Sequence, residues 1–191
     1  MPDEKAILLH VCCAPCAAPS GERLMDAGDD PTLFFSNSNI APKAEYDKRL
    51  AHAKKLAAIW GVRLIEDEYD HEAWRETVRG YEDGPERGER CRRCFAFSLA
   101  RANRMAEELG VARFTTTLTL SSHKVSRMVF EAGARHERYE PHNFKKKNGE
   151  RRSRELCDLY DLYRQDYCGC EFSLRDRERA ARARAESVGA E

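Results

Sequence analysis

The sequence lacks a net charge, a membrane-spanning run and a secretory leader. Lys and Arg together number 33 and so do Asp and Glu, so the chain is no bulk polycation that binds nucleic acid through overall charge, although a local basic patch is not excluded. No apolar run approaches the roughly 20 residues of a membrane helix. The opening MPDEKAILLHVCC holds acidic residues and no small-residue cleavage pattern. We therefore expect a cytoplasmic protein that does not contact membranes.

Three common motifs are also absent. The sequence contains neither the G-x-x-x-x-G-K-S/T nor the G-x-G-x-x-G phosphate loop, and it has no G-x-S-x-G nucleophile elbow.

The length of 191 residues corresponds to one domain. Charged residues make up 35% of the chain, above the usual ~25%, which indicates a heavily ionised surface around an adequate core.

Apolar runs alternate with segments of helical periodicity. The predicted strands cover 5–11, 31–35, 62–65 and 114–119. The predicted helices cover 17–27, 45–60, 95–109, 153–163 and a segment that opens at 121. The opening β-α-β-α-β order favours a parallel sheet with helices on its faces. We predict one α/β domain over 1–173, with a helical C-terminal part, and a charged, helical or disordered tail over 174–191.

Eight cysteines are the main chemical signal, and they occur in tight groups. A chain of this length without a signal peptide is not typical of a disulfide scaffold. Clustered cysteines in a reducing compartment instead favour metal, iron–sulfur or redox chemistry.

Cys12 and Cys13 follow the first predicted strand and precede a helix. A helix N-terminus lowers thiol pKa values and stabilises anionic sulfur, which suits thiolate ligands. The polar loop 36–39 follows the second strand, so both loops should open at the carboxyl edge of the sheet, where ligands bind. The alternative is that Cys12, Cys13 and nearby Cys16 are buried small hydrophobic residues.

Cys91 and Cys94 form a C-x-x-C pair at a second predicted helix start. This spacing occurs in zinc sites, in iron–sulfur sites and in thioredoxin-like redox pairs. Together with Cys12 and Cys13, the pair supplies the four thiolates of a [4Fe–4S] cluster or of a Cys₄ zinc site.

Cys168 and Cys170 are separated by one glycine. A disulfide across one residue is strained and easily reduced, so the pair suits a redox-active dithiol or open metal ligands better than a static crosslink. Cys157 falls on the apolar face of a predicted helix and is interpreted as structural.

The basic segment 145–154 is the candidate nucleic-acid contact, with Phe144 as a base-stacking platform. Its cations include Lys145, Lys146, Lys147, Arg151 and Arg152. The alternative is an ordinary solvated loop. Among the histidines, His10 is expected in the core, whereas His123 is the better site candidate.

Several motifs, in order, resemble the QueH family of cobalamin-independent epoxyqueuosine reductases. They are HVCCAPC at 10–16, ERCRRCF at 89–95, FTTTLT at 114–119, SHK at 122–124, NFKKK at 143–147 and YRQDYCGCEFS at 163–173. The resemblance runs from about residue 5 to residue 173. It implies an adenine-nucleotide-alpha-hydrolase-like α/β fold, and it implies reductive removal of the epoxide oxygen from epoxyqueuosine at the tRNA wobble position, the last step of queuosine synthesis.

The resemblance also implies a cofactor and roles for the cysteines. Cys12, Cys13, Cys91 and Cys94 would hold a [4Fe–4S] cluster, and Cys16 would bind a second, mononuclear iron beside it. Cys168 and Cys170 would be the redox-active pair. The partners would be tRNA carrying epoxyqueuosine and an electron donor that the sequence does not identify.

Two alternatives come from other functional classes. A Cys₄ zinc module that binds RNA without catalysis predicts a colourless, zinc-containing protein. A thiol–disulfide oxidoreductase that uses Cys91 and Cys94 predicts a metal-free protein active on generic disulfides. The order of the motifs favours the reductase.

Overall fold

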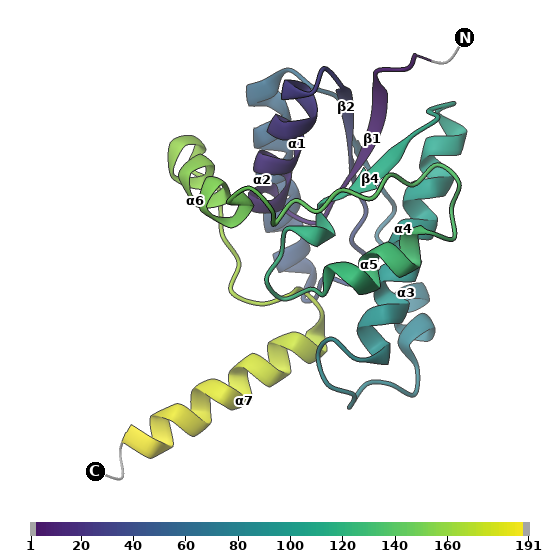
Figure 1. Ribbon diagram of the computed structural model, residues 1–191. Coiled ribbons are helices and arrows are strands. Elements are labelled where there is room, and N and C mark those ends of the chain that lie inside the picture. The colour runs from purple at the N-terminus through teal and green to yellow at the C-terminus, as the bar shows by residue number, and fades with distance from the viewer. Residues whose placement is uncertain (1–2, 189–191) are drawn as a thin grey trace.

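The apolar runs of the sequence become the strands of one parallel sheet in the computed structural model, which describes residues 3–188 (Figure 1). The strands are β1 Ala6–Val11, β2 Asp30–Phe35, β3 Leu64–Glu66 and β4 Phe114–Thr116. They lie in the order β3-β2-β1-β4, and every pair is parallel. The predicted α/β fold class is confirmed.

The structure has seven α-helices within residues 3–188, and six of them cover the two faces of this sheet (Figure 1). The seven are α1 Ala14–Asp26, α2 Lys43–Trp60, α3 His71–Val78, α4 Glu89–Glu108, α5 Ser126–Gly133, α6 Gly149–Tyr160 and α7 Glu171–Val188. Helices α1, α2 and α6 lie on one side, and α3, α4 and α5 on the other (Figure 1). The chain therefore changes sides between β1 and β4, and the carboxyl ends of these two strands form the switch point at which such sheets bind ligands.

Several boundaries differ from the sequence prediction, including those of α6, which covers 149–160 rather than 153–163. Helix α1 begins before the predicted 17–27, α4 begins at Glu89 rather than at 95, and α3 was not expected. The strand predicted over 114–119 ends at Thr116, because the Thr116 hydroxyl accepts a hydrogen bond from Leu118 N (3.2 Å) and the chain turns into a 3₁₀ segment, Thr117–Thr119. The helix predicted to open at 121 begins only at Ser126.

His10 ties together the carboxyl ends of three strands. Its buried ring lies with Nδ1 2.8 Å from Thr116 Oγ1 and Nε2 3.0 Å from the carbonyl oxygen of Ser36, which follows β2. Burial lowers the pKa of His10, so the ring is neutral at neutral pH. The prediction that His10 is a core residue is confirmed.

Asp67 forms a partly buried ion pair just beyond β3. Its carboxylate accepts hydrogen bonds from Arg101 Nε (2.5 Å) and Ser36 Oγ (2.5 Å), which connects β2, β3 and α4. Burial alone raises the pKa of Asp67, but the hydrogen bonds from Arg101 and Ser36 outweigh burial and hold it below its usual value.

The substitution Asp67→Asn is expected to lower the free energy of unfolding by about 2 kcal/mol at neutral pH, because it leaves Arg101 without its carboxylate. A carboxyl whose folded pKa is depressed stabilises the fold above its unfolded pKa of about 3.9, and this stabilisation disappears as the pH falls through the folded pKa. Urea unfolding at neutral and acidic pH measures the difference between the two proteins. An undiminished difference in acid would contradict this assignment.

The C-terminal helix α7 begins in the body of the protein and then leaves it. Phe172 packs with the buried Trp74, whereas residues 177–186 are exposed and extend away from the domain (Figure 1). None of the helices within residues 3–188 combines the length and the apolar character that crossing a membrane requires.

Candidate functional site

Three cysteines meet where β1 passes into α1. Cys13 has an extended backbone and caps α1, and Pro15 occupies the first turn, where a missing N–H costs nothing. Cys12, Cys13 and Cys16 are buried, and their Sγ atoms all lie within 4.8 Å of one another, with 3.8 Å between those of Cys12 and Cys13. These three cysteines can therefore supply sulfur ligands to one metal ion.

Hydrogen bonds among these sulfurs favour a thiolate at Cys12. The thiols of Cys13 and Cys16 lower the pKa of Cys12, and the hydrogen bond with Cys12 in turn raises the pKa of Cys13 to about 12 and raises that of Cys16. Thr117 Oγ1 also donates to Cys12 Sγ (3.3 Å), and Gln165 Nε2 donates to Cys13 Sγ (2.9 Å). Thiolate is the form that binds metals.

A second group of cysteines forms where α4 begins. Cys91 and Cys94 lie in its first two turns, and burial followed by the charge of Cys168 raises the pKa of both. Burial likewise raises the pKa of Cys170 to about 12, with Cys168 adding to the effect. Arg87 N donates to Cys91 Sγ (3.2 Å). Cys168 and Cys170 therefore lie near the C-x-x-C pair at the start of α4, although more than 70 residues separate the two pairs in the sequence.

One small cavity joins the two groups. Cys12, Cys94 and Cys168 line it, together with the side chains of Lys124 and Arg49. Lys124 is buried, and although burial lowers its pKa, the electrostatic effect of the surrounding cysteine sulfurs raises it overall. A cation in this position offsets the negative charge of assembled thiolates.

The residues present therefore fit a thiolate-bound metal or cluster. Within residues 3–188, the only group of three or more ligand-type side chains with ligand atoms close enough to share one metal is Cys12, Cys13 and Cys16. The cavity adds Cys94 from the other group. Sulfur ligands of this kind suit iron–sulfur clusters and zinc.

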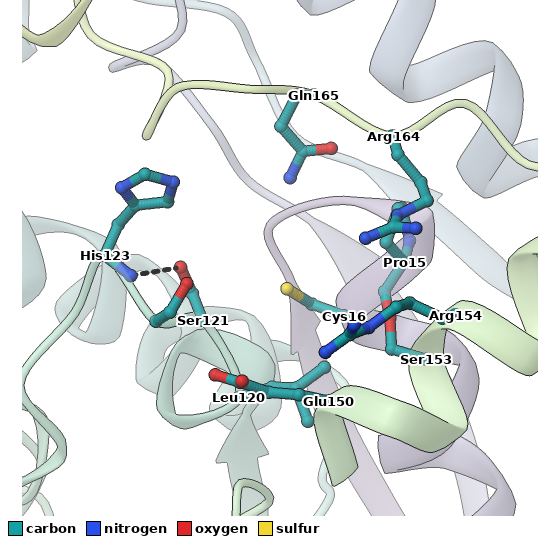
Figure 2. Close-up of a pocket in the computed structure, with 11 residues that line it drawn as sticks. Pro15, Cys16, Leu120, Ser121, His123, Glu150, Ser153, Arg154, Arg164 and Gln165 are labelled. Atoms are coloured by element: carbon teal, nitrogen blue, oxygen red, sulfur yellow. Dashed lines mark hydrogen bonds between the residues drawn. The ribbon is translucent and has the colours of Figure 1, made fainter.

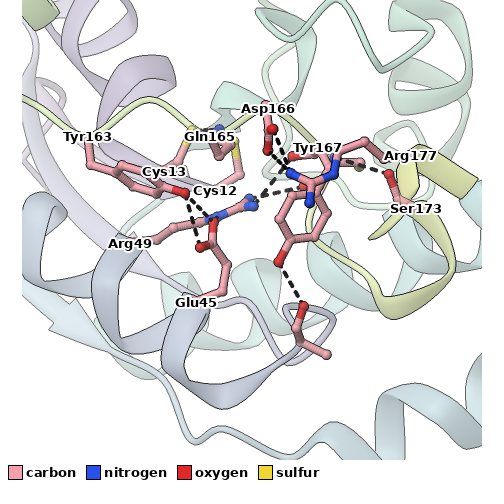
Figure 3. Close-up of polar contacts among 12 residues, drawn as sticks. Cys12, Cys13, Glu45, Arg49, Tyr163, Gln165, Asp166, Tyr167, Ser173 and Arg177 are labelled. Carbon is pink, nitrogen blue, oxygen red and sulfur yellow. Dashed lines mark hydrogen bonds and ion pairs between the residues drawn. The ribbon is translucent and has the colours of Figure 1, made fainter. Parts of the chain in front are cut away.

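Arg49 fixes the segment that carries Cys168 (Figure 3). Its Nη1 donates to the carbonyl of Cys168 (3.1 Å) and its Nη2 to that of Tyr167 (3.4 Å). Glu45 accepts from Arg49 Nε (2.7 Å) and from the Tyr163 hydroxyl (3.1 Å), so it locks the guanidinium in place. Only 2% of the Arg49 surface is exposed.

Arg49, Lys124 and Gln165 are site residues that the sequence prediction did not include. Glu45 and Arg49 resemble an ordinary pair, four residues apart, on a surface helix. Lys124 and Gln165 lie in two of the recognised motifs, which was the only sequence signal for them.

A separate, open pocket lies beside Cys16 (Figure 2). Cys16, His123, Gln165 and two arginines are among the residues that line it. Burial, followed by the charge of Lys124, lowers the pKa of His123. His123 is therefore neutral at neutral pH and can act as a hydrogen-bonding group, and it stays a site candidate.

The role predicted for Phe144 is wrong. Its ring is 1% exposed, stacks on His142 at 5.4 Å between ring centres and lies beneath Arg23, so it belongs to the core and is closed to a nucleic-acid base. The aromatic ring is buried because its own loop folds back over α1.

Several cations of the basic segment are engaged by neighbouring residues. Lys145 Nζ donates to the Lys124 carbonyl (2.6 Å), Arg151 pairs with Glu155 (3.3 Å) and Arg152 with Glu22 (2.6 Å). The exposed lysines are Lys146 and Lys147. Contact of this segment with nucleic acid stays a prediction.

Comparison with known proteins gives a consistent result. The family model described as Epoxyqueuosine reductase QueH matches residues 7–176. A protein of that name from Streptococcus pyogenes serotype M1 is 40% identical over 89% of this chain and 71% of its own length. One from Thermotoga maritima is 36% identical over 90% and 91%, and one from Acinetobacter baylyi is 36% identical over 91% and 82%. The chain therefore belongs to the QueH family of epoxyqueuosine reductases.

Proposed function

We propose that this protein reduces epoxyqueuosine to queuosine at the wobble position of tRNA. One observation carries the proposal: cysteines from three distant segments, represented by Cys12, Cys94 and Cys168, line one cavity at the carboxyl edge of the sheet. Family membership supplies the substrate. A tRNA substrate agrees with the cytoplasmic location expected from the sequence.

Seven of the eight cysteines have roles in this proposal. Cys12, Cys13, Cys91 and Cys94 hold a [4Fe–4S] cluster, and Cys16 contributes to an adjacent iron. When bound, these groups supply single-electron transfer and Lewis-acid polarisation of the epoxide oxygen. The compact group of Cys12, Cys13 and Cys16 supports metal binding at the end of β1.

Cys168 and Cys170 match the stoichiometry of the reaction. Conversion of an epoxide into an alkene and water consumes two electrons and two protons. Oxidation of two thiols to a disulfide releases two electrons and two protons, and an external donor must then reduce the disulfide. Arg49 holds the backbone of Cys168 beside the shared cavity, so the dithiol stays next to the cluster ligands.

The direct test is an anaerobic assay of the iron-loaded protein with tRNA that carries epoxyqueuosine and a chemical reductant. Mass spectrometry of the digested nucleosides should show loss of one oxygen and formation of queuosine. A zinc-containing protein that binds the RNA without converting it would support the Cys₄ zinc module. A metal-free protein that reduces generic disulfides would support the thiol–disulfide oxidoreductase.

A further inference from the structure

The pocket beside Cys16 is open to solvent and has its own set of polar side chains. It lies between the start of α1, the segment 120–123, α6 and the segment 164–165, and its volume is about 190 Å³. Figure 2 shows the sulfur of Cys16 at the pocket, between Gln165 and the side chains of α6. The pocket therefore leads from the surface to the proposed metal ligands.

Two arginines without a carboxylate partner reach into this pocket. Arg154 comes from α6 and Arg164 from the segment after it, and in Figure 2 both guanidinium groups extend toward Cys16. Neither has an ion pair or side-chain hydrogen bond to another described residue, whereas Arg151 and Arg152 of the same helix are paired with Glu155 and Glu22. The two arginines at the pocket therefore keep an uncompensated positive charge, whereas carboxylates compensate the charges of the two arginines outside it.

The charged residues that line the pocket indicate which kind of anion it binds. A planar guanidinium binds a phosphate with two parallel hydrogen bonds, and two of them surround one phosphate group. Glu150 lies in the same pocket and provides an acceptor for hydroxyl or amino groups. The combination of two guanidiniums and one carboxylate matches a ligand that has a phosphate together with hydrogen-bond donors, which describes a nucleotide.

The size of the pocket indicates how much of a nucleotide enters. Its volume of about 190 Å³ lies below the roughly 300–1,000 Å³ of pockets that enclose a whole small molecule. A phosphate with part of its sugar fits this space, and the base remains outside it or continues toward the cysteines. Sequence-specific RNA recognition uses unstacked nucleotides of this kind.

We infer that Arg154 and Arg164 bind an RNA phosphate next to the reacting nucleotide and hold it at the mouth of the Cys16 pocket. This inference rests on the proposed function, since it takes the RNA to be the substrate. It assigns the main phosphate contact to Arg154, the last residue of the basic segment, and to Arg164, which lies outside that segment.

The test is the affinity of the anaerobically iron-loaded protein for an anticodon stem-loop RNA, measured by fluorescence anisotropy over a range of salt concentrations. Arg154→Ala and Arg164→Ala should each weaken binding about tenfold, because each removes a charged hydrogen-bonding partner. The slope of log affinity against log salt should become shallower by about 0.7 for each phosphate that is no longer neutralised. Arg104→Ala is the matched control, because Arg104 is exposed and pairs with Glu108 on the far part of α4.

Four outcomes would overturn this inference. If the unsubstituted protein binds the RNA normally and both variants keep its affinity, this inference is overturned and the proposed function stands. The same follows if Arg151→Ala, rather than these two variants, loses affinity for the RNA. Loss of affinity for inorganic phosphate alone, with RNA affinity unchanged, also overturns it. If the unsubstituted protein neither binds the RNA nor reduces epoxyqueuosine, the proposed function fails and the inference fails with it. Unchanged melting temperatures and visible spectra exclude misfolding of the variants.

Discussion

The substitution Cys168→Ser is expected to abolish turnover and leave the visible absorbance of the cluster unchanged. Serine has nearly the shape of cysteine, but its hydroxyl cannot form a disulfide, so the dithiol can no longer supply its two electrons and two protons. We expect the rate to fall by on the order of 10³-fold or more, as when other essential reacting groups are removed. Turnover of epoxyqueuosine and the visible spectrum are measured on the same preparation.

Cys170→Ser should behave in the same way, because a disulfide requires both sulfurs. Cys157→Ser is the matched control: Cys157 is buried in α6 and has no part in the shared cavity, so turnover and colour should persist. Loss of absorbance in Cys168→Ser would contradict the dithiol role and make Cys168 a cluster ligand.

The substitution Cys94→Ser is expected to remove the cluster itself. Cys94 is the residue of the C-x-x-C pair that lines the cavity with Cys12, so it connects the two groups of sulfurs. Without its thiolate, iron content should fall from about four or more atoms per chain to well below one, and turnover should fall to background. Iron and acid-labile sulfide analysis measures the change.

Cys16→Ser provides the comparison for this prediction. If Cys16 binds only the adjacent iron, its replacement should remove about one iron per chain and leave the cluster absorbance, since the four cluster thiolates remain. The contrary pattern, with colour retained in Cys94→Ser and absent in Cys16→Ser, would place the cluster on Cys12, Cys13 and Cys16.

The sheet was predictable because its strands are short apolar runs with distinct boundaries. The predicted segments 5–11 and 31–35 coincide closely with the observed β1 and β2. Helix α3 was missed because its eight residues carry few apolar side chains, and the burial of Trp74 depends on Phe172 of a distant helix. The end of β4 depends on one side-chain hydrogen bond at Thr116, which residue type alone does not reveal.

The candidate site was predictable as a set of cysteines but not as an arrangement. Spacing indicated thiolate pairs, and the parallel sheet placed Cys12 and Cys13 at its carboxyl edge. Their proximity to Lys124 and Arg49 depends on contacts between segments far apart in sequence, such as Arg49 with the Cys168 carbonyl. Phe144 shows the opposite error: an aromatic residue in a basic run was assigned to the surface, although its apolar ring is more stable in the core.

An anaerobic visible spectrum of the purified protein, combined with iron, sulfide and zinc analysis, tests whether these cysteines assemble an iron–sulfur redox centre. We expect a brown protein that bleaches with dithionite and contains roughly four or more irons per chain. A colourless protein that retains zinc after anaerobic reconstitution with iron and sulfide would contradict the iron–sulfur assignment.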